Sequence, residues 1–248
     1  MSAVGLVMAK APVPGQVKTR LARTVGAERA ATLACAALLD TLDVCEAVFA
    51  RGRRVLALTG GLAQAVGAPE LLAALAGWQV IAQHGAGLGA RIANAHRDVH
   101  VLVGAPVVQI GMDTPHLPSE FLATVAHRAQ RRGRPILGLA DDGGWWVLTS
   151  PVPTTVDHLD RVPMSRPDTG AATLRALSLA GSVPVLAPTL GDVDTADDAE
   201  RAAAAAPHTR FARAWLAGDA SLPNGDASLL NGDGAWLAGD AAVRVGRP

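Results

Sequence analysis

The sequence predicts a single α/β domain in which helices flank a mostly parallel central sheet. Short apolar runs alternate with longer alanine-rich amphipathic segments, a pattern typical of parallel strands that are connected by helices. Half of the 248 residues are hydrophobic and 18% are charged, so the chain can bury a sizeable core.

The predicted elements follow in chain order. The run 4–9 is apolar, and it stops at a segment 10–15 that is rich in proline and cannot be helical. Further short apolar runs predict strands at 53–59, 78–83, 107–111, 136–139, 145–149 and 183–186. Amphipathic segments predict helices at 27–50, 69–76, 88–99, 119–132, 169–180 and 194–206. The last helix opens on acidic residues, which the helix dipole favours at an N-terminus.

Residues 1–206 form the predicted domain, and 207–248 form a C-terminal appendage. Beyond residue 207 the hexapeptide Trp-Leu-Ala-Gly-Asp-Ala occurs at 215–220 and again at 236–241, with Asn-Gly-Asp turns between the two copies. The repeat is too short and too rare for a solenoid. We therefore expect the appendage to be loosely packed or partly disordered.

Composition excludes several functions. The 22 basic residues balance the 22 acidic ones, which gives no basis for binding nucleic acid or an acidic membrane surface. The sequence shows no signal peptide and no apolar run long enough to cross a bilayer. Cys35 and Cys45 lie about 15 Å apart along one predicted helix, too far for a disulfide, so we expect two reduced core cysteines. These features predict a soluble, cytoplasmic protein.

A cationic loop follows the first predicted strand. Of the 22 basic residues only Lys10 and Lys18 are lysines, and both lie in this loop together with Arg20. The loop leaves the carboxyl end of a strand and enters a helix, so its N–H groups and charges suit an anion. Two unrelated surface lysines are the alternative. The candidate nucleotide-binding residues of this loop are Ala9, Lys10, Gly15, Lys18 and Arg20.

A glycine-rich segment, 84–89, precedes another predicted helix. Alternate glycines allow a ligand to approach the backbone, so Gly85, Gly89 and the following Arg91 are further candidates for nucleotide binding. A tight turn explains the same glycines equally well.

Two carboxylates are candidate metal ligands. The strand 107–111 leads to Asp113 just before a proline, and Asp194 opens the last predicted helix. Carboxylate oxygens suit Mg²⁺ or Mn²⁺, ions that would also hold diphosphate oxygens. The alternatives are that Asp113 only starts a turn and that Asp194 only caps the helix. Asp192 could take the place of Asp194 as the second metal ligand.

The segment 140–146 predicts an acceptor pocket. Asp142 leads into a tight turn and then into two tryptophans, whose rings point to opposite faces of a strand. Its carboxylate is a candidate general base for an acceptor hydroxyl, although a purely structural hairpin is the alternative. Ser165 lies in a segment that could contact phosphates or cap the next helix. The candidate acceptor residues are Asp142, Gly143, Gly144, Trp145 and Ser165.

Taken in order, these segments resemble a family of bacterial glycosyltransferase-A-like proteins in the nucleotide-diphospho-sugar transferase superfamily. Members are often labelled arsenosugar-biosynthesis-type glycosyltransferases. The resemblance spans about 4–205 and implies a single Rossmann-like glycosyltransferase-A domain. The motifs are Ala-Lys-x-Pro-x-Pro-Gly-x-Val-Lys-Thr-Arg-Leu from Ala9, Gly-x-Asp-x-Pro-x-Leu from Gly111, Asp-Gly-Gly with two aromatics from Asp142, and Asp-Val-Asp-Thr from Asp192.

This chain departs from the family pattern at several positions. Trp145 and Trp146 stand where the family usually has tyrosines, Met164 stands where a tryptophan is usual, and Gly87 stands where an acidic residue is frequent. The last two departures could alter the donor or acceptor pocket, so the substrates of relatives do not transfer directly to this chain.

More distant resemblances concern the same charged positions. Lys18-Thr19-Arg20-Leu21 is similar to the Lys-Ser-Arg-Leu segment of 2-phospholactate guanylyltransferases. Molybdenum-cofactor guanylyltransferases carry basic triphosphate-binding residues at this loop position. Asp113 and Asp194 look like the paired metal aspartates of sugar-activating cytidylyltransferases.

These resemblances imply a metal-dependent transferase with a nucleotide or nucleotide-sugar donor and a small-molecule acceptor. We favour a glycosyltransferase, in which Mg²⁺ or Mn²⁺ at Asp113 neutralises the departing nucleoside diphosphate and Asp142 deprotonates the acceptor. The alternative is a nucleotidyltransferase, in which Lys18 and Arg20 stabilise the transferring group as a substrate phosphate attacks a nucleoside triphosphate. A third hypothesis is that the protein binds a nucleotide without catalysing a reaction. The base, the sugar, the acceptor and the oligomeric state stay open, a homo-oligomer included.

Overall fold

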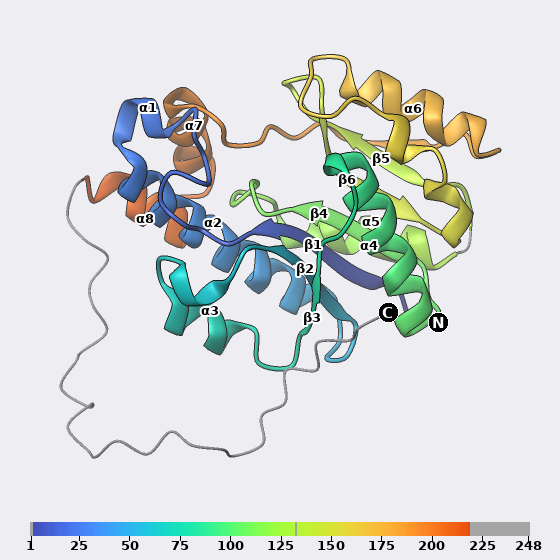
Figure 1. Ribbon diagram of the computed structural model, residues 1–248, viewed down its shortest axis with the longest axis horizontal. Coiled ribbons are helices and arrows are strands. Elements are labelled where there is room, and N and C mark those ends of the chain that lie inside the picture. Colours follow the sequence, from blue (N-terminus) through green and yellow to red (C-terminus); the bar gives the residue numbers. More distant parts are fainter. Residues whose placement is uncertain (1, 132, 219–248) are drawn as a thin grey trace.

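A computed structural model describes residues 2–131 and 133–218, which form a seven-stranded sheet in the order β3-β2-β1-β4-β6-β5-β7 (Figure 1). Neighbouring strands pair in parallel, except that β6 runs antiparallel to both β4 and β5. The predicted strands are all present and the mostly parallel sheet is confirmed. They are β1 (Val4–Lys10), β2 (Arg54–Thr59), β3 (Gln79–Ala82), β4 (Val107–Gly111), β5 (Ile136–Leu139), β6 (Trp145–Ser150) and β7 (Val185–Ala187).

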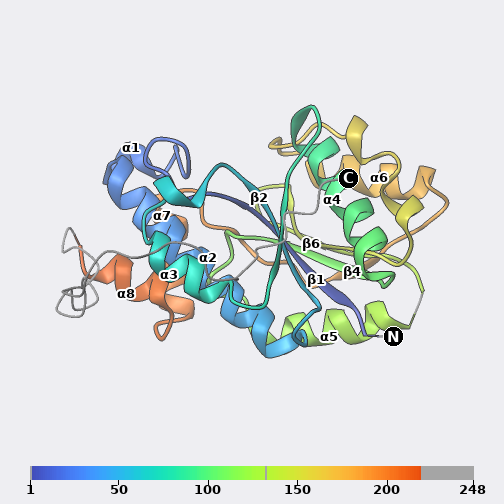
Figure 2. The same cartoon turned by 60° about the horizontal axis from the view of Figure 1, so that its bottom comes forward.

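Helices cover both faces of this sheet (Figure 2). The helices α2 (Ala27–Val48), α3 (Ala68–Ala74) and α5 (Ser119–Gln130) pack on one face, and α4 (Gly87–Val103) and α6 (Thr169–Leu179) pack on the other. Val7 belongs to the first core and its neighbour Leu6 to the second, as strand alternation requires. Burial on both faces explains why the strands read as continuous apolar runs.

A third cluster of apolar side chains lies beyond the carboxyl ends of the strands. It joins α2 to α1 (Ala22–Val25), α7 (Ala196–Ala205) and α8 (Arg210–Leu216). The helix predicted from 194 begins at Ala196, because Thr195 is its N-cap and forms a capping box with Asp198. Three short 3₁₀ helices complete the described residues: η1 (Leu62–Gln64), η2 (Pro153–Val156) and η3 (Leu159–Arg161).

The start of the predicted appendage differs from the loose packing expected for it. Helix α8 packs against α2, and Phe211 is only 1% exposed. The carboxylate of Asp40 on α2 accepts hydrogen bonds from the backbone N–H groups of Arg210 and Phe211, at 3.0 and 2.8 Å. Residues 207–218 are therefore part of the packed body. The remainder of the appendage, with the second copy of the hexapeptide, lies outside the described residues.

Both cysteines are free and buried, as predicted. Burial raises the pKa of each thiol to about 12, so neither is a thiolate near neutral pH. Among the described residues, no helix is both long enough and apolar enough to span a membrane.

Candidate functional site

The topology of the sheet brings the charged segments to one edge. Strands β1 and β4 are parallel neighbours, so the cationic loop after β1 and Asp113 after β4 leave the sheet side by side. The antiparallel strand β6 starts at this same edge, which adds the 140–144 turn between β5 and β6. Three segments that are far apart in sequence therefore meet at one edge of the sheet.

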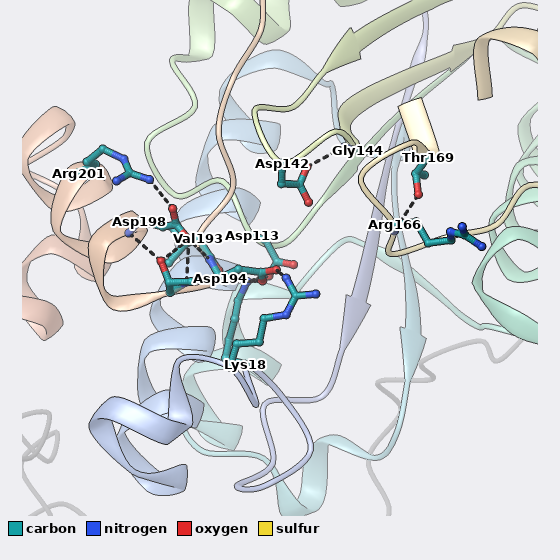
Figure 3. A network of polar contacts seen from close by, with 12 residues as sticks. Lys18, Asp113, Asp142, Gly144, Arg166, Thr169, Val193, Asp194, Asp198 and Arg201 are labelled. Atoms are coloured by element: carbon teal, nitrogen blue, oxygen red, sulfur yellow. Dashed lines mark hydrogen bonds and ion pairs between the residues drawn. The ribbon is translucent and has the colours of Figure 1, made fainter. Parts of the chain in front are cut away.

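Lys18 is the centre of this meeting point (Figure 3). Its Nζ lies 2.8 Å from Asp113 Oδ1 and 3.5 Å from Asp194 Oδ1, and it donates a hydrogen bond to the carbonyl of Val193. The side chain is only 7% exposed. Burial alone lowers the pKa of Lys18, but the carboxylates of Asp113, Asp194 and Asp192 outweigh burial and raise this pKa above its usual value. The ammonium group is thus a buried cation held by two carboxylates.

Arg20 extends the ion-pair network toward solvent. Its Nη1 lies 3.0 Å from Asp194 Oδ2, so the two oxygens of Asp194 face two different cations. The Arg20 side chain is 59% exposed, in contrast to the buried Lys18.

A cluster of carboxylates adjoins the lysine. Oxygen atoms of Asp142, Asp192 and Asp194 all lie within 4.8 Å of one another. Burial, together with the neighbouring Asp142 and Asp194, raises the pKa of Asp192 to about 6. Such crowding of negative charge is what a bound cation would relieve, and the all-oxygen donor set fits Mg²⁺ or Mn²⁺.

A cavity of about 310 Å³ opens beside these charges. Five of the predicted site residues line it: three from the cationic loop and the two predicted metal ligands. Its lining also includes residues that the sequence did not single out. The lining residues are Lys10, Gln16, Val17, Lys18, Thr19, Arg20, Ala34, Met112, Asp113 and Asp194.

The other predicted nucleotide-binding residues are not among the described residues that line this cavity. Ala9 is buried, Gly15 lies in an exposed turn, and Gly85 accepts a long 3.4 Å hydrogen bond from the Arg91 side chain. Gly89 has a packing role, because a Cβ there would lie 2.3 Å from the carbonyl oxygen of Leu159 in η3. Nucleotide contact by these positions stays a prediction.

The Asp142 turn is held in place by close packing against α6. The Gly144 N–H donates to Asp142 Oδ1 at 2.7 Å, and the Gly170 N–H donates to the carbonyl of Gly143 at 2.7 Å. A Cβ on Gly143 would lie 1.9 Å from the Pro167 carbonyl oxygen, and one on Gly170 would lie 2.8 Å from that of Gly144. Backbone contacts of this kind fix the position from which Asp142 reaches the carboxylate cluster.

The two tryptophans point to opposite faces of the sheet, as predicted. Trp145 is half-buried and its Nε1–H donates to Thr173 Oγ1 at 3.1 Å. Trp146 is buried in the opposite core and donates to the Pro188 carbonyl at 2.9 Å. Ser165 has a left-handed backbone, φ 59°, in the loop just before α6.

The prediction missed two residues that shape this edge. The Sδ of Met112 accepts a hydrogen bond from the Lys10 N–H at 3.3 Å, and Met112 lines the cavity. Gln83 Nε2 donates to the carbonyls of Ala9 and Ala57, at 2.9 and 2.8 Å, which ties together the ends of β1 and β2. A polar residue directly after an apolar strand was the available signal for Gln83.

The fold is similar to that of solved transferase structures. A protein from Desulfovibrio desulfuricans G20, assigned as a nucleotide-diphospho-sugar transferase, is 26% identical over 87% of this chain and 94% of that chain, with a TM-score of 0.72. A 4-diphosphocytidyl-2C-methyl-D-erythritol synthase is 12% identical over 82% of this chain and 97% of that one, with a TM-score of 0.52. The synthase of that name from Anaerococcus prevotii DSM 20548 is 9% identical over 82% and 95%, with a TM-score of 0.51. The last two show a shared fold alone.

The first of these likenesses supports the predicted superfamily, whereas the arsenosugar label and the guanylyltransferase resemblances stay predictions. No curated protein matches the chain in sequence. Residues 41–166, just over half of the chain, match a family described as uncharacterized protein conserved in bacteria, DUF2064. The match includes Asp113 and the Asp142 turn. The chain therefore belongs to the DUF2064 family.

Proposed function

We propose that this protein is a metal-dependent glycosyltransferase that moves a sugar from a nucleoside-diphosphate sugar to a small acceptor. The observation that carries the proposal is the single cavity lined by Lys10, Lys18, Arg20, Asp113 and Asp194. The cationic side chains can bind the negatively charged diphosphate, and the carboxylates can bind the metal ion that accompanies the diphosphate. The likeness to a protein assigned as a nucleotide-diphospho-sugar transferase supports this choice of donor.

The chain's own residues have separate roles in this proposal. Lys10 and Arg20 bind the diphosphate from the open side of the cavity. Asp113 and Asp194 hold Mg²⁺ or Mn²⁺, with Asp192 close enough to contribute. The metal supplies positive charge against the departing nucleoside diphosphate.

The acceptor lies beside the Asp142 turn in this proposal. Asp142 accepts the proton of the acceptor hydroxyl, while Trp145 provides an apolar surface for the acceptor. The packing of the turn against α6 keeps the carboxylate in a fixed position, which general-base catalysis requires.

Nucleotidyl transfer is the second candidate, and the cationic loop favours it. Lys18 and Arg20 both lie next to Asp194, where they would stabilise a transferring phosphoryl group and a pyrophosphate leaving group. A phosphate nucleophile is already ionised, so this reaction needs no base at Asp142.

A ligand screen separates the two candidates. Thermal shift with Mg²⁺ or Mn²⁺ compares GTP and CTP with UDP-, GDP- and dTDP-sugars, and each hit is then assayed for donor hydrolysis and for pyrophosphate release. We expect stabilisation by a nucleotide sugar and its slow hydrolysis. Pyrophosphate release that depends on an added phosphate acceptor would replace the first candidate with the second.

Replacing Asp113 tests the metal site. We expect Asp113→Asn to weaken Mn²⁺-dependent nucleotide binding at least about tenfold, because a neutral amide is a much weaker ligand for a hard cation. Isothermal titration calorimetry measures the affinity. Asp157→Asn is the matched control, since Asp157 pairs with Arg97 on the surface and lines no part of the cavity. If the two variants bind the nucleotide with equal affinity in the presence of Mn²⁺, Asp113 is not a metal ligand.

A further inference from the structure

The ammonium group of Lys18 lies where the two predicted metal ligands converge. It is 2.8 Å from Asp113 Oδ1 and 3.5 Å from Asp194 Oδ1, and it also bonds the carbonyl of Val193. A metal ion that binds both carboxylates through these oxygens would take the place of the ammonium group. The positive charges of the lysine and of the metal would also repel each other at this distance.

Lys18 contacts the two carboxylates (Figure 3) and is also one of the residues that line the 310 Å³ cavity. Its side chain has a flexible four-carbon stem, so a released ammonium group would have the cavity within reach. Arg20 bonds the other oxygen of Asp194 from the solvent side, so this ion pair does not depend on where Lys18 points.

We propose that Lys18 is an internal counter-ion that competes with the divalent cation for Asp113 and Asp194, and that metal binding releases it toward the nucleotide phosphates. The proposal rests on the proposed function for the identity of both ligands. It predicts that metal and nucleotide bind cooperatively, because the metal creates the free ammonium group that the phosphates need.

The wild-type protein allows a direct test, because its only two lysines are Lys10 and Lys18. Amine-labelling rates, followed by peptide mass spectrometry without nucleotide, report on each lysine separately. Lys10 is exposed and serves as the internal reference. We expect Mn²⁺ to accelerate labelling of Lys18 at least about threefold relative to Lys10, since an ion pair and burial protect the amine only in the metal-free form.

A charge-removing variant gives an independent measurement. We expect Lys18→Met to bind Mn²⁺ at least about tenfold more tightly than wild type in the absence of nucleotide, because the competing cation is gone. Lys10→Met is the matched control: it removes the same charge from the same cavity but not from the carboxylates, and its affinity should stay within about threefold of wild type. Circular dichroism checks that each variant is folded.

Each outcome decides between the two proposals. Unchanged or weaker Mn²⁺ binding by Lys18→Met, with unchanged Lys18 labelling, overturns the competition while the transferase proposal stands if wild type binds metal and nucleotide sugar. Tighter Mn²⁺ binding by this variant, without any nucleotide binding by wild type, supports the competition and overturns the transferase. Absence of Mn²⁺ binding from every variant overturns both. The labelling experiment decides the question if Lys18→Met does not fold.

Discussion

Asp142 is the residue whose replacement best distinguishes sugar transfer from nucleotidyl transfer. Asparagine keeps an oxygen that can accept the Gly144 N–H but cannot take a proton from an acceptor. If Asp142 is the base, we expect Asp142→Asn to lower kcat by about 10²- to 10⁴-fold while the Kd of the donor changes little. Steady-state kinetics and calorimetry measure the two quantities.

The neighbouring carboxylate provides the control for this prediction. Asp141→Asn removes a negative charge one residue away, and Asp141 does not belong to the described carboxylate cluster. A decrease below about tenfold in Asp142→Asn, or an equal decrease in Asp141→Asn, would contradict the base role. Mn²⁺ affinity is measured in parallel, because Asp142 lies within reach of Asp194.

A buried histidine predicts how stability depends on pH. His96 bonds Ser150 Oγ at 2.6 Å and Gln109 Oε1 at 3.3 Å, and burial lowers its pKa to about 3. Between pH 6.5 and 3, His96 therefore binds a proton in the unfolded chain but not in the folded chain. The contribution of His96 to stability is therefore complete above pH 6.5 and is lost progressively as the pH falls below it.

Urea denaturation at pH 7.5 and 5.0 measures this loss of stability. We expect His96→Gln to reduce the difference in unfolding free energy between the two pH values, because glutamine does not titrate. His127→Gln, on the exposed face of α5, should leave the difference unchanged. An unaltered pH dependence in His96→Gln would show that other groups cause it.

The limits of sequence prediction at the residue scale are clear at Lys18. That Lys18 and Asp113 share a pocket was predictable, because both follow the carboxyl ends of strands at one sheet edge. That the ammonium group is buried between Asp113 and Asp194 was not, because it depends on side-chain rotation and on a loop 175 residues away.

At the scale of elements, the contact between α4 and η3 explains Gly89. We expect Gly89→Ala to destabilise the protein by about 1–3 kcal/mol, since the added Cβ would collide with the Leu159 carbonyl. Chemical denaturation measures the change. Gly61→Ala is the control, because its added Cβ would meet nothing within 4 Å and its φ is not positive. If Gly89→Ala does not change the free energy of unfolding, nucleotide contact is the better explanation of the glycine at this position.

Element boundaries were predictable where turn residues mark them. The strands 107–111 and 136–139 have the predicted ends. Helix α4 continues beyond the predicted 99 to Val103, because its C-cap is Gly104 in a left-handed conformation, a signal that the prediction did not use. Helix α1 has only four residues, too few to show a helical pattern. The antiparallel direction of β6 relative to β4 depends on long-range pairing that no local segment encodes.

For the whole molecule, α8 shows that the packed body extends past residue 206. We expect Phe211→Ala to cost about 3–5 kcal/mol of unfolding free energy, because its side chain fills the cluster between α2 and α7. Leu216→Ala on the same helix is the control, since Leu216 is 74% exposed. A loss below about 1 kcal/mol in Phe211→Ala would mean that α8 contributes little to the fold. Sequence could not predict this packing, because the apolar face of a seven-residue helix is too short to stand out among turn formers.

The backbone of Lys18 has a consequence for how this loop can change. Its φ of 47° lies in the left-handed region, where glycine is unstrained and a residue with a Cβ is not. Requirements for folding alone would favour glycine at this position, yet only a long cationic side chain can reach Asp113. Folding preference and chemistry thus oppose each other at one residue. A glycine there would relieve the strain of the loop but would leave Asp113 and Asp194 without their buried counter-ion, so the ion pairs keep in place a side chain that the backbone conformation disfavours.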